Sequence, residues 1–200
     1  MRNSPKGKLP FISLASGERI GDSTLCYQYL KEHNNVADVD SSLTEEERAS
    51  AVAYKAWLEE WVYFLMIWDK WIDNWYDCRE TFFARAVPFY PARVVIFNFV
   101  VYRNISSMLH AKGITRHSKP EIVSFIAEAA KAMSVLVGEK GMFNGKPCAV
   151  NAFMMGILIA IYDWPQLNKA WAPEIAKYPN LRRWTENMIS TYFPERKLRC

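Results

Sequence analysis

Residues able to do metal, redox or acid–base chemistry are scattered along the 200 positions of this chain. Its four cysteines form no C-x-x-C pair and have no histidine at ligand spacing: Cys26, Cys78, Cys148 and Cys200. Its three histidines are isolated from one another: His33, His110 and His117. We therefore expect no metal site, no disulfide framework and no catalytic residue among them. A reducing intracellular compartment fits these thiols best.

Carboxylates gather in one segment, residues 44–75, where they could serve general acid–base catalysis. Two pairs occur there: Glu59 with Glu60, and Asp69 with Asp73. No cleft or partner motif accompanies them, so we interpret both pairs as the solvated face of a helix.

Tryptophans in the same segment follow helical spacing: Trp57, Trp61, Trp68, Trp71 and Trp75. A flat-cofactor or carbohydrate site is one interpretation, but aromatic residues at this spacing are more often core or interface. Because the eight tryptophans of the chain are hard to bury in one small bundle, we predict that part of the stripe is exposed to a protein partner. Basic residues do not alternate with aromatic ones, so we expect no nucleic-acid groove.

These residues must be positioned by helices. A capping box at Thr44 and Glu47 begins a helix that meets no Gly or Pro before about Asn74, which predicts roughly 30 residues and about 45 Å. Further helices are expected at 92–111, 119–137, 149–162 and 180–192. The longest apolar run, within 149–162, has about half of the roughly 20 residues that span a bilayer, so we predict a buried core helix and no transmembrane segment.

The first 35 residues differ in kind. They predict a strand entered through Pro10, a turn at residues 16–18, a second strand and a helix at 23–33. The apolar stripe of that helix covers the sheet: Leu25, Cys26, Tyr29 and Leu30. Asn34 and Asn35 end it. This β-β-α unit resembles the second half of a thioredoxin-like domain.

We expect four segments: a partial thioredoxin-like domain at 1–35, a linker at 36–43, an all-helical domain at 44–195 and a basic tail at 196–200. Three sequence strings resemble the failed-axon-connections branch of glutathione-transferase-like proteins, which is related to the metaxins. They are LEEWVY with KWID (58–63, 70–73), GITRHS (113–118), and PNL with YFPE (179–181, 192–195). The resemblance implies a mainly α fold, with a truncated thioredoxin-like β-β-α unit before a glutathione-transferase-type helical bundle.

The resemblance also implies a place for glutathione. In that superfamily the residue before a cis-proline pairs with the peptide backbone of glutathione, and an acidic-Ser pair holds its γ-glutamyl end. By position these residues are Leu9, Pro10, Asp22 and Ser23. Taken by residue type alone, Pro10 begins an edge strand and Asp22 or Ser23 is an ordinary N-cap, so both interpretations stay open.

In those enzymes the Tyr, Ser or Cys that activates glutathione lies in the first βα segment, which would fall before Met1. A thiol with a pKa of about 8.5 stays mostly protonated at neutral pH without that help. The resemblance also implies a Ser or Thr followed by Asp at the start of the helix at 149–162. This chain has Cys148 and Asn151 instead, so we expect a cap weaker by about 1 kcal/mol.

We therefore predict a non-catalytic interaction scaffold or structural subunit of a larger assembly, either cytoplasmic or associated with mitochondria. Its protein partners would bind the Trp-rich helix and the open sheet edge. The alternatives are a glutathione-binding transferase or isomerase that uses the residual cradle, and a ligand carrier with a groove beside the long helix. The net charge of +4 includes basic termini, which indicate either solvated tails or contact with an acidic partner or membrane surface: Arg2, Lys6, Lys8, Arg196, Lys197 and Arg199.

Overall fold

The computed structural model describes residues 4–7, 9–34 and 36–198. The chain divides into two compact units, Met1–Ser42 and Leu43–Cys200, and each is described by itself. Several residues named above lie outside the described ones: Arg2, Lys8, Asn35, Arg199 and Cys200. Leu43, assigned to the linker from the sequence, is buried in the core of the second unit.

The first unit is a hairpin followed by a helix. Strands β1 (Phe11–Ser13) and β2 (Arg19–Gly21) pair antiparallel, and α1 (Ser23–His33) follows at once. The Cys26 thiol is buried and donates to the carbonyl oxygen of Ile20 at 3.2 Å, which ties the helix to β2. The predicted stripe is less complete than expected, because Leu25 is 42% exposed.

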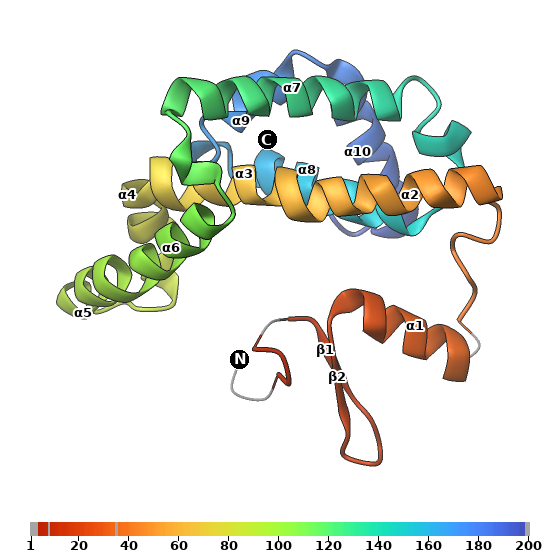
Figure 1. Ribbon diagram of the computed structural model, residues 1–200, viewed down its shortest axis with the longest axis horizontal. Helices are drawn as coiled ribbons and strands as arrows, with labels where there is room; N and C mark the ends of the chain where they lie inside the picture. Colours follow the sequence, from red (N-terminus) through yellow and green to blue (C-terminus); the bar gives the residue numbers. More distant parts are fainter. Residues whose placement is uncertain (1–3, 8, 35, 199–200) are drawn as a thin grey trace. The chain divides into compact units, whose positions relative to one another are not determined.

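The long helix begins as predicted, with a reciprocal capping box. The Glu47 N–H donates to Thr44 Oγ1 at 3.2 Å, and the Thr44 N–H donates to Glu47 Oε2 at 2.8 Å. Four consecutive helical stretches then reach Asn74, two of them π-helical: α2 (Glu45–Trp57), η1 (Leu58–Val62), α3 (Tyr63–Trp68) and η2 (Asp69–Asp73). They extend in one direction (Figure 1).

The long helix was expected to end at about Asn74, and this bound is wrong. Helical turns continue to residue 85 through α4 (Trp75–Asp77), η3 (Cys78–Phe82) and η4 (Phe83–Arg85). This stretch also has no Gly or Pro, so nothing in the backbone stops the helix before Pro88.

The remaining elements complete a helical bundle (Figure 1). They are α5 (Tyr90–Ile96), η5 (Phe97–Tyr102), α6 (Arg103–Ala111), η6 (Ile114–Arg116), α7 (Lys119–Val137), η7 (Met142–Gly145), α8 (Ala149–Asp163), η8 (Pro165–Leu167), α9 (Trp171–Ala176) and α10 (Pro179–Tyr192). The short helix α9 has no counterpart in the sequence analysis. The mainly α fold with a short β-β-α unit is confirmed.

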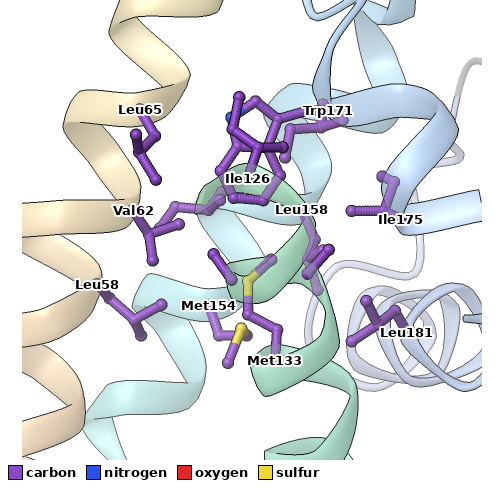
Figure 2. Packing of buried hydrophobic residues seen from close by; sticks show 14 of the residues in the cluster. Leu58, Val62, Leu65, Ile126, Met133, Met154, Leu158, Trp171, Ile175 and Leu181 are labelled. Carbon is purple, nitrogen blue, oxygen red and sulfur yellow. The ribbon is translucent and has the colours of Figure 1, made fainter. Parts of the chain in front are cut away.

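The core of the second unit surrounds α8. Side chains from five parts of the chain converge there (Figure 2), among them Leu58, Leu65, Ile126, Met154, Leu158, Trp171 and Leu181. Half of α8 is buried, which explains why its sequence is apolar on nearly every side. No helix formed by the described residues is long and apolar enough to cross a membrane, and the core-helix prediction is confirmed.

Candidate functional site

The four residues that the sequence singled out as a glutathione cradle lie at one end of the small sheet. The register pairs Phe11 with Gly21, so Pro10 and Asp22 follow as the next pair, and the Asp22 N–H donates to the Pro10 carbonyl at 3.2 Å. The peptide bond between Leu9 and Pro10 is cis, and the side chain of Leu9 is 65% exposed. Ser23, half-buried, is the first residue of α1.

Asp22 caps α1 and carries the negative charge of this corner. Its φ of 94° is rare outside glycine, and its Oδ1 accepts the Thr24 N–H at 2.9 Å. The hydrogen bond from the Thr24 backbone, with help from Leu25 and the charge of Lys6, lowers the pKa of this carboxyl. An ionised carboxylate beside exposed helix N–H groups can face an ammonium and a carboxylate together, the two charges of an α-amino acid end.

The cysteines whose surroundings are described are not built as nucleophiles. Cys26, Cys78 and Cys148 are all buried, and burial raises the pKa of Cys78 to about 12. A thiol in this state is neutral and inert at neutral pH. Among the described residues, no three His, Cys, Asp or Glu side chains are grouped to hold a metal ion.

Asp69 is not on a solvated face, and that interpretation is corrected here. Its side chain is 0% exposed, and its Oδ2 accepts the N–H groups of Ala170 and Trp171, each at 3.0 Å. Its Oδ1 accepts Asn74 Nδ2 at 2.7 Å. Burial raises the pKa of Asp69 to about 6, against the opposing effect of these backbone donors. The Asp69 carboxylate, which belongs to η2, therefore caps the N-terminus of α9.

Asp73, the other member of that pair, is half-buried and bound to Lys119 Nζ at 2.7 and 2.8 Å. The two carboxylates thus hold separate structural contacts and do not form an acid–base pair. A charged residue on a helix with almost no polar face was the available signal that Asp69 is buried.

The tryptophans are also more deeply placed than the sequence predicted. Trp68, Trp171 and Trp184 are buried, and most of the others are half-buried. Trp75 is the most exposed of the eight tryptophans, all of which are described, at 37%. The stripe on the long helix is therefore mainly core, because α7 and α8 pack against it.

The apolar surface lies instead on the next helix. Four side chains of α5 and η5 are exposed at positions i, i+1, i+4 and i+5, and we call them the α5–η5 face: Val95 (56%), Ile96 (39%), Phe99 (66%) and Val100 (51%). Residues at this spacing share one side of a helix. Phe89 and Tyr90, 69% and 55% exposed, precede this face at the start of the helix.

The opposite side of the same helix is anchored. Phe97 is fully buried in a small cluster with Cys78 and Leu167. Glu80 accepts from Arg79 Nε at 2.7 Å and from Arg93 Nη2 at 2.8 Å, which joins η3 to α5. The α5–η5 face is thus held on a fixed support although its own side chains are exposed.

Comparison with known proteins agrees with these features. Residues 1–76 match the family model described as the glutathione S-transferase N-terminal domain, which covers the β-β-α unit and continues through the long helix. An isoprene-epoxide–glutathione S-transferase of Rhodococcus sp. (strain AD45) is 26% identical over 96% of this chain and 80% of its own length. No solved structure gave a significant match.

Two further relatives carry the names that the sequence strings pointed to. A metaxin-1 homolog of Caenorhabditis briggsae is 26% identical and the Failed axon connections protein of Drosophila melanogaster is 28% identical, each over 96% of this chain. The chain spans 61% and 48% of the length of these two relatives. The resemblance to glutathione-transferase-like proteins of the failed-axon-connections and metaxin-related kind is confirmed.

Proposed function

We propose that this chain is a non-catalytic glutathione-transferase-like protein that acts as an interaction scaffold or structural subunit of a larger protein assembly. The observation that carries the proposal is the α5–η5 face. Contiguous exposed apolar side chains on a folded domain mark binding surfaces more often than chance exposure does. Association with mitochondria is part of the proposal and follows from the likeness to a metaxin-1 homolog.

The chemistry of the face supports a protein partner. Phe99 is a large aromatic anchor with aliphatic neighbours one turn away, the composition found at the centre of protein interfaces. Arg103, which is exposed, belongs to the same helical run, so a charged group is available near the rim. The supporting ion pairs of Glu80 keep the helix in place before a partner binds, which lowers the ordering cost of binding.

The double variant Val95→Glu/Phe99→Glu tests the proposal. Two charges on this face should release the chain from its assembly, because an interface centre does not tolerate unpaired carboxylates. The free energy of unfolding should change by no more than about 0.5 kcal/mol per site, because both side chains are exposed. The measurement is the mass of the native particle by light scattering after gel filtration.

A matched control uses two valines elsewhere that are more exposed than Val95 and Phe99, Val52 at 70% and Val135 at 73%. The variant Val52→Glu/Val135→Glu adds the same charge and should leave the particle mass unchanged. If both double variants lose assembly equally, or if neither loses it, the α5–η5 face is not the docking surface.

The second candidate is a glutathione-binding enzyme, supported by the corner at Pro10 and Asp22 and by the likeness to a bacterial glutathione S-transferase. If this candidate is right, glutathione binds by titration calorimetry and a chloronitrobenzene is conjugated. Asp22→Asn keeps an N-cap acceptor but removes the charge that would face the γ-glutamyl ammonium, so it should weaken binding about ten-fold or more. If the chain is a scaffold, neither the unchanged chain nor Asp22→Asn conjugates glutathione to the chloronitrobenzene.

A further inference from the structure

The second unit contains a small cavity that neither the scaffold nor the glutathione corner uses. It has a volume of about 270 Å³ and is lined by residues of α3, η2 and α8, with Trp164 and Asn168 beyond the end of α8. Most of its wall is apolar or aromatic, with Met66, Trp71 and Ile159 among the lining side chains. Cavities for drug-sized ligands begin at about 300 Å³, so an occupant must be smaller than these.

One wall holds a lysine whose ammonium lies over aromatic rings and has no carboxylate partner among the described residues. Lys70 Nζ lies 3.7 Å from the ring centroid of Phe82 and 5.5 Å from that of Trp71. No carboxylate of the described residues is within ion-pair distance of this ammonium. Burial lowers the pKa of Lys70, which is the mark of a cation held away from water without an anion.

Asn168 belongs to the wall and is held by the protein itself. It is 1% exposed, and its Nδ2 donates to the carbonyl oxygens of Trp164 at 2.9 Å and Ala160 at 3.3 Å. Its Oδ1 is buried as well, so this amide helps to shape the wall and offers a ligand no hydrogen bond.

The wall is also hollowed at a glycine. Gly156 lies in the middle of α8, and a Cβ placed on it would meet nothing within 4 Å. Glycine in a helix interior costs about 1 kcal/mol relative to alanine, so the missing side chain is not explained by helix stability. It enlarges the cavity opposite the aromatic residues.

The charge of the cavity favours an anion. Asp163 is the lining carboxylate, and Arg196 Nη2 binds it at 2.6 Å. Lys70 therefore adds a positive charge that this ion pair does not neutralise. Arg85 lies over the outer aromatic wall, 5.0 Å from the ring of Trp164, and adds to the positive potential.

We propose that this cavity binds a small amphipathic carboxylate. The carboxylate pairs with the Lys70 ammonium, and a flat or aliphatic body contacts the apolar and aromatic lining, where Gly156 leaves space. The charge selects for this class, because an uncharged ligand leaves the ammonium unpaired.

Indole-3-acetate has the required carboxylate and flat body, and serves as the probe in titration calorimetry on the full chain. Binding should saturate at micromolar to low millimolar concentration, as expected for a ligand of this size. Indole-3-acetamide lacks the charge and should bind at least ten-fold more weakly, as should indole-3-acetate to Lys70→Met. Lys140→Met, an exposed lysine outside the cavity, is the control and should bind like the unchanged chain.

Gly156→Leu places a side chain in the cavity and should abolish binding, whereas Gly156→Ala should retain it and melt at an equal or higher temperature. A melting curve confirms that each variant is folded. The proposal is overturned if indole-3-acetate shows no saturable binding, if its amide binds equally well, or if folded Lys70→Met or Gly156→Leu binds it as tightly as the unchanged chain.

Discussion

At the scale of single residues, Asp69 shows how a carboxylate can be structural where its type suggests catalysis. It is fully buried, and three N–H donors hold it, one from Asn74 at the end of η2 and two from the start of α9. The sequence identified the Asp69–Asp73 pair but not its role, because the donors at Ala170 and Trp171 lie about a hundred positions away. The pairing of Pro10 with Asp22 could be predicted because those residues are close in sequence and joined by one hairpin.

The burial of Asp69 gives stability an unusual dependence on pH. Its pKa is raised from 3.8 to about 6 in the folded chain, so between about pH 4 and pH 6 the folded state binds more protons than the unfolded state. This group alone therefore makes stability fall as pH rises through that range, by at most about 3 kcal/mol.

The measurement is the free energy of urea unfolding for the unchanged chain and for Asp69→Asn at several values of pH. The free energy of unfolding of the unchanged chain, minus that of Asp69→Asn, should fall by this amount from pH 4 to about pH 6 and then level off. If the same signed difference is constant, or becomes more positive as pH rises, the assigned environment of Asp69 is contradicted.

At the scale of elements, the sequence predicts helices well where their signals are local. The capping boxes at Thr44 and Ser118 and the absence of Gly and Pro after Thr44 place two long helices correctly. The continuation of the helix to residue 85 was missed, although no Gly or Pro occurs between Thr44 and Pro88. Helix α9 was missed because its N-terminal donors are satisfied by Asp69 and not by a neighbouring residue.

The cap of α8 gives a test at this scale. Cys148 is its N-cap with extended backbone angles, and the buried Asn151 donates from Nδ2 to the Lys146 carbonyl at 3.2 Å. A serine hydroxyl accepts a hydrogen bond more strongly than a thiol, so Cys148→Ser should raise the free energy of unfolding by about 0.5–1 kcal/mol.

The same change at Cys78 is the matched control and should have the opposite sign. Cys78 is 0% exposed among Phe97 and Leu167, where a hydroxyl replaces an apolar contact. Cys78→Ser should lower the free energy of unfolding by about 1 kcal/mol or more. If both variants shift urea unfolding in the same direction, the cap of α8 does not work as described.

At the scale of the whole molecule, the two units differ in the kind of binding site that they could form. The first unit has a corner formed by the cis Leu9–Pro10 bond and Asp22, and the second presents an exposed apolar helix on a rigid support. The sequence predicted an exposed aromatic surface but placed it on the Trp-rich helix. Periodicity shows that a helix has an apolar side, but only the packing of α7 and α8 decides which helix is left uncovered.

We propose that this protein works in an assembly through the α5–η5 face. The most direct test is the mass of the native particle isolated from its source, with the masses of the polypeptides that migrate with it on a native gel. The account predicts a particle at least twice the mass of one chain, which the Val95→Glu/Phe99→Glu variant fails to join. An unassociated single chain that conjugates glutathione would contradict it.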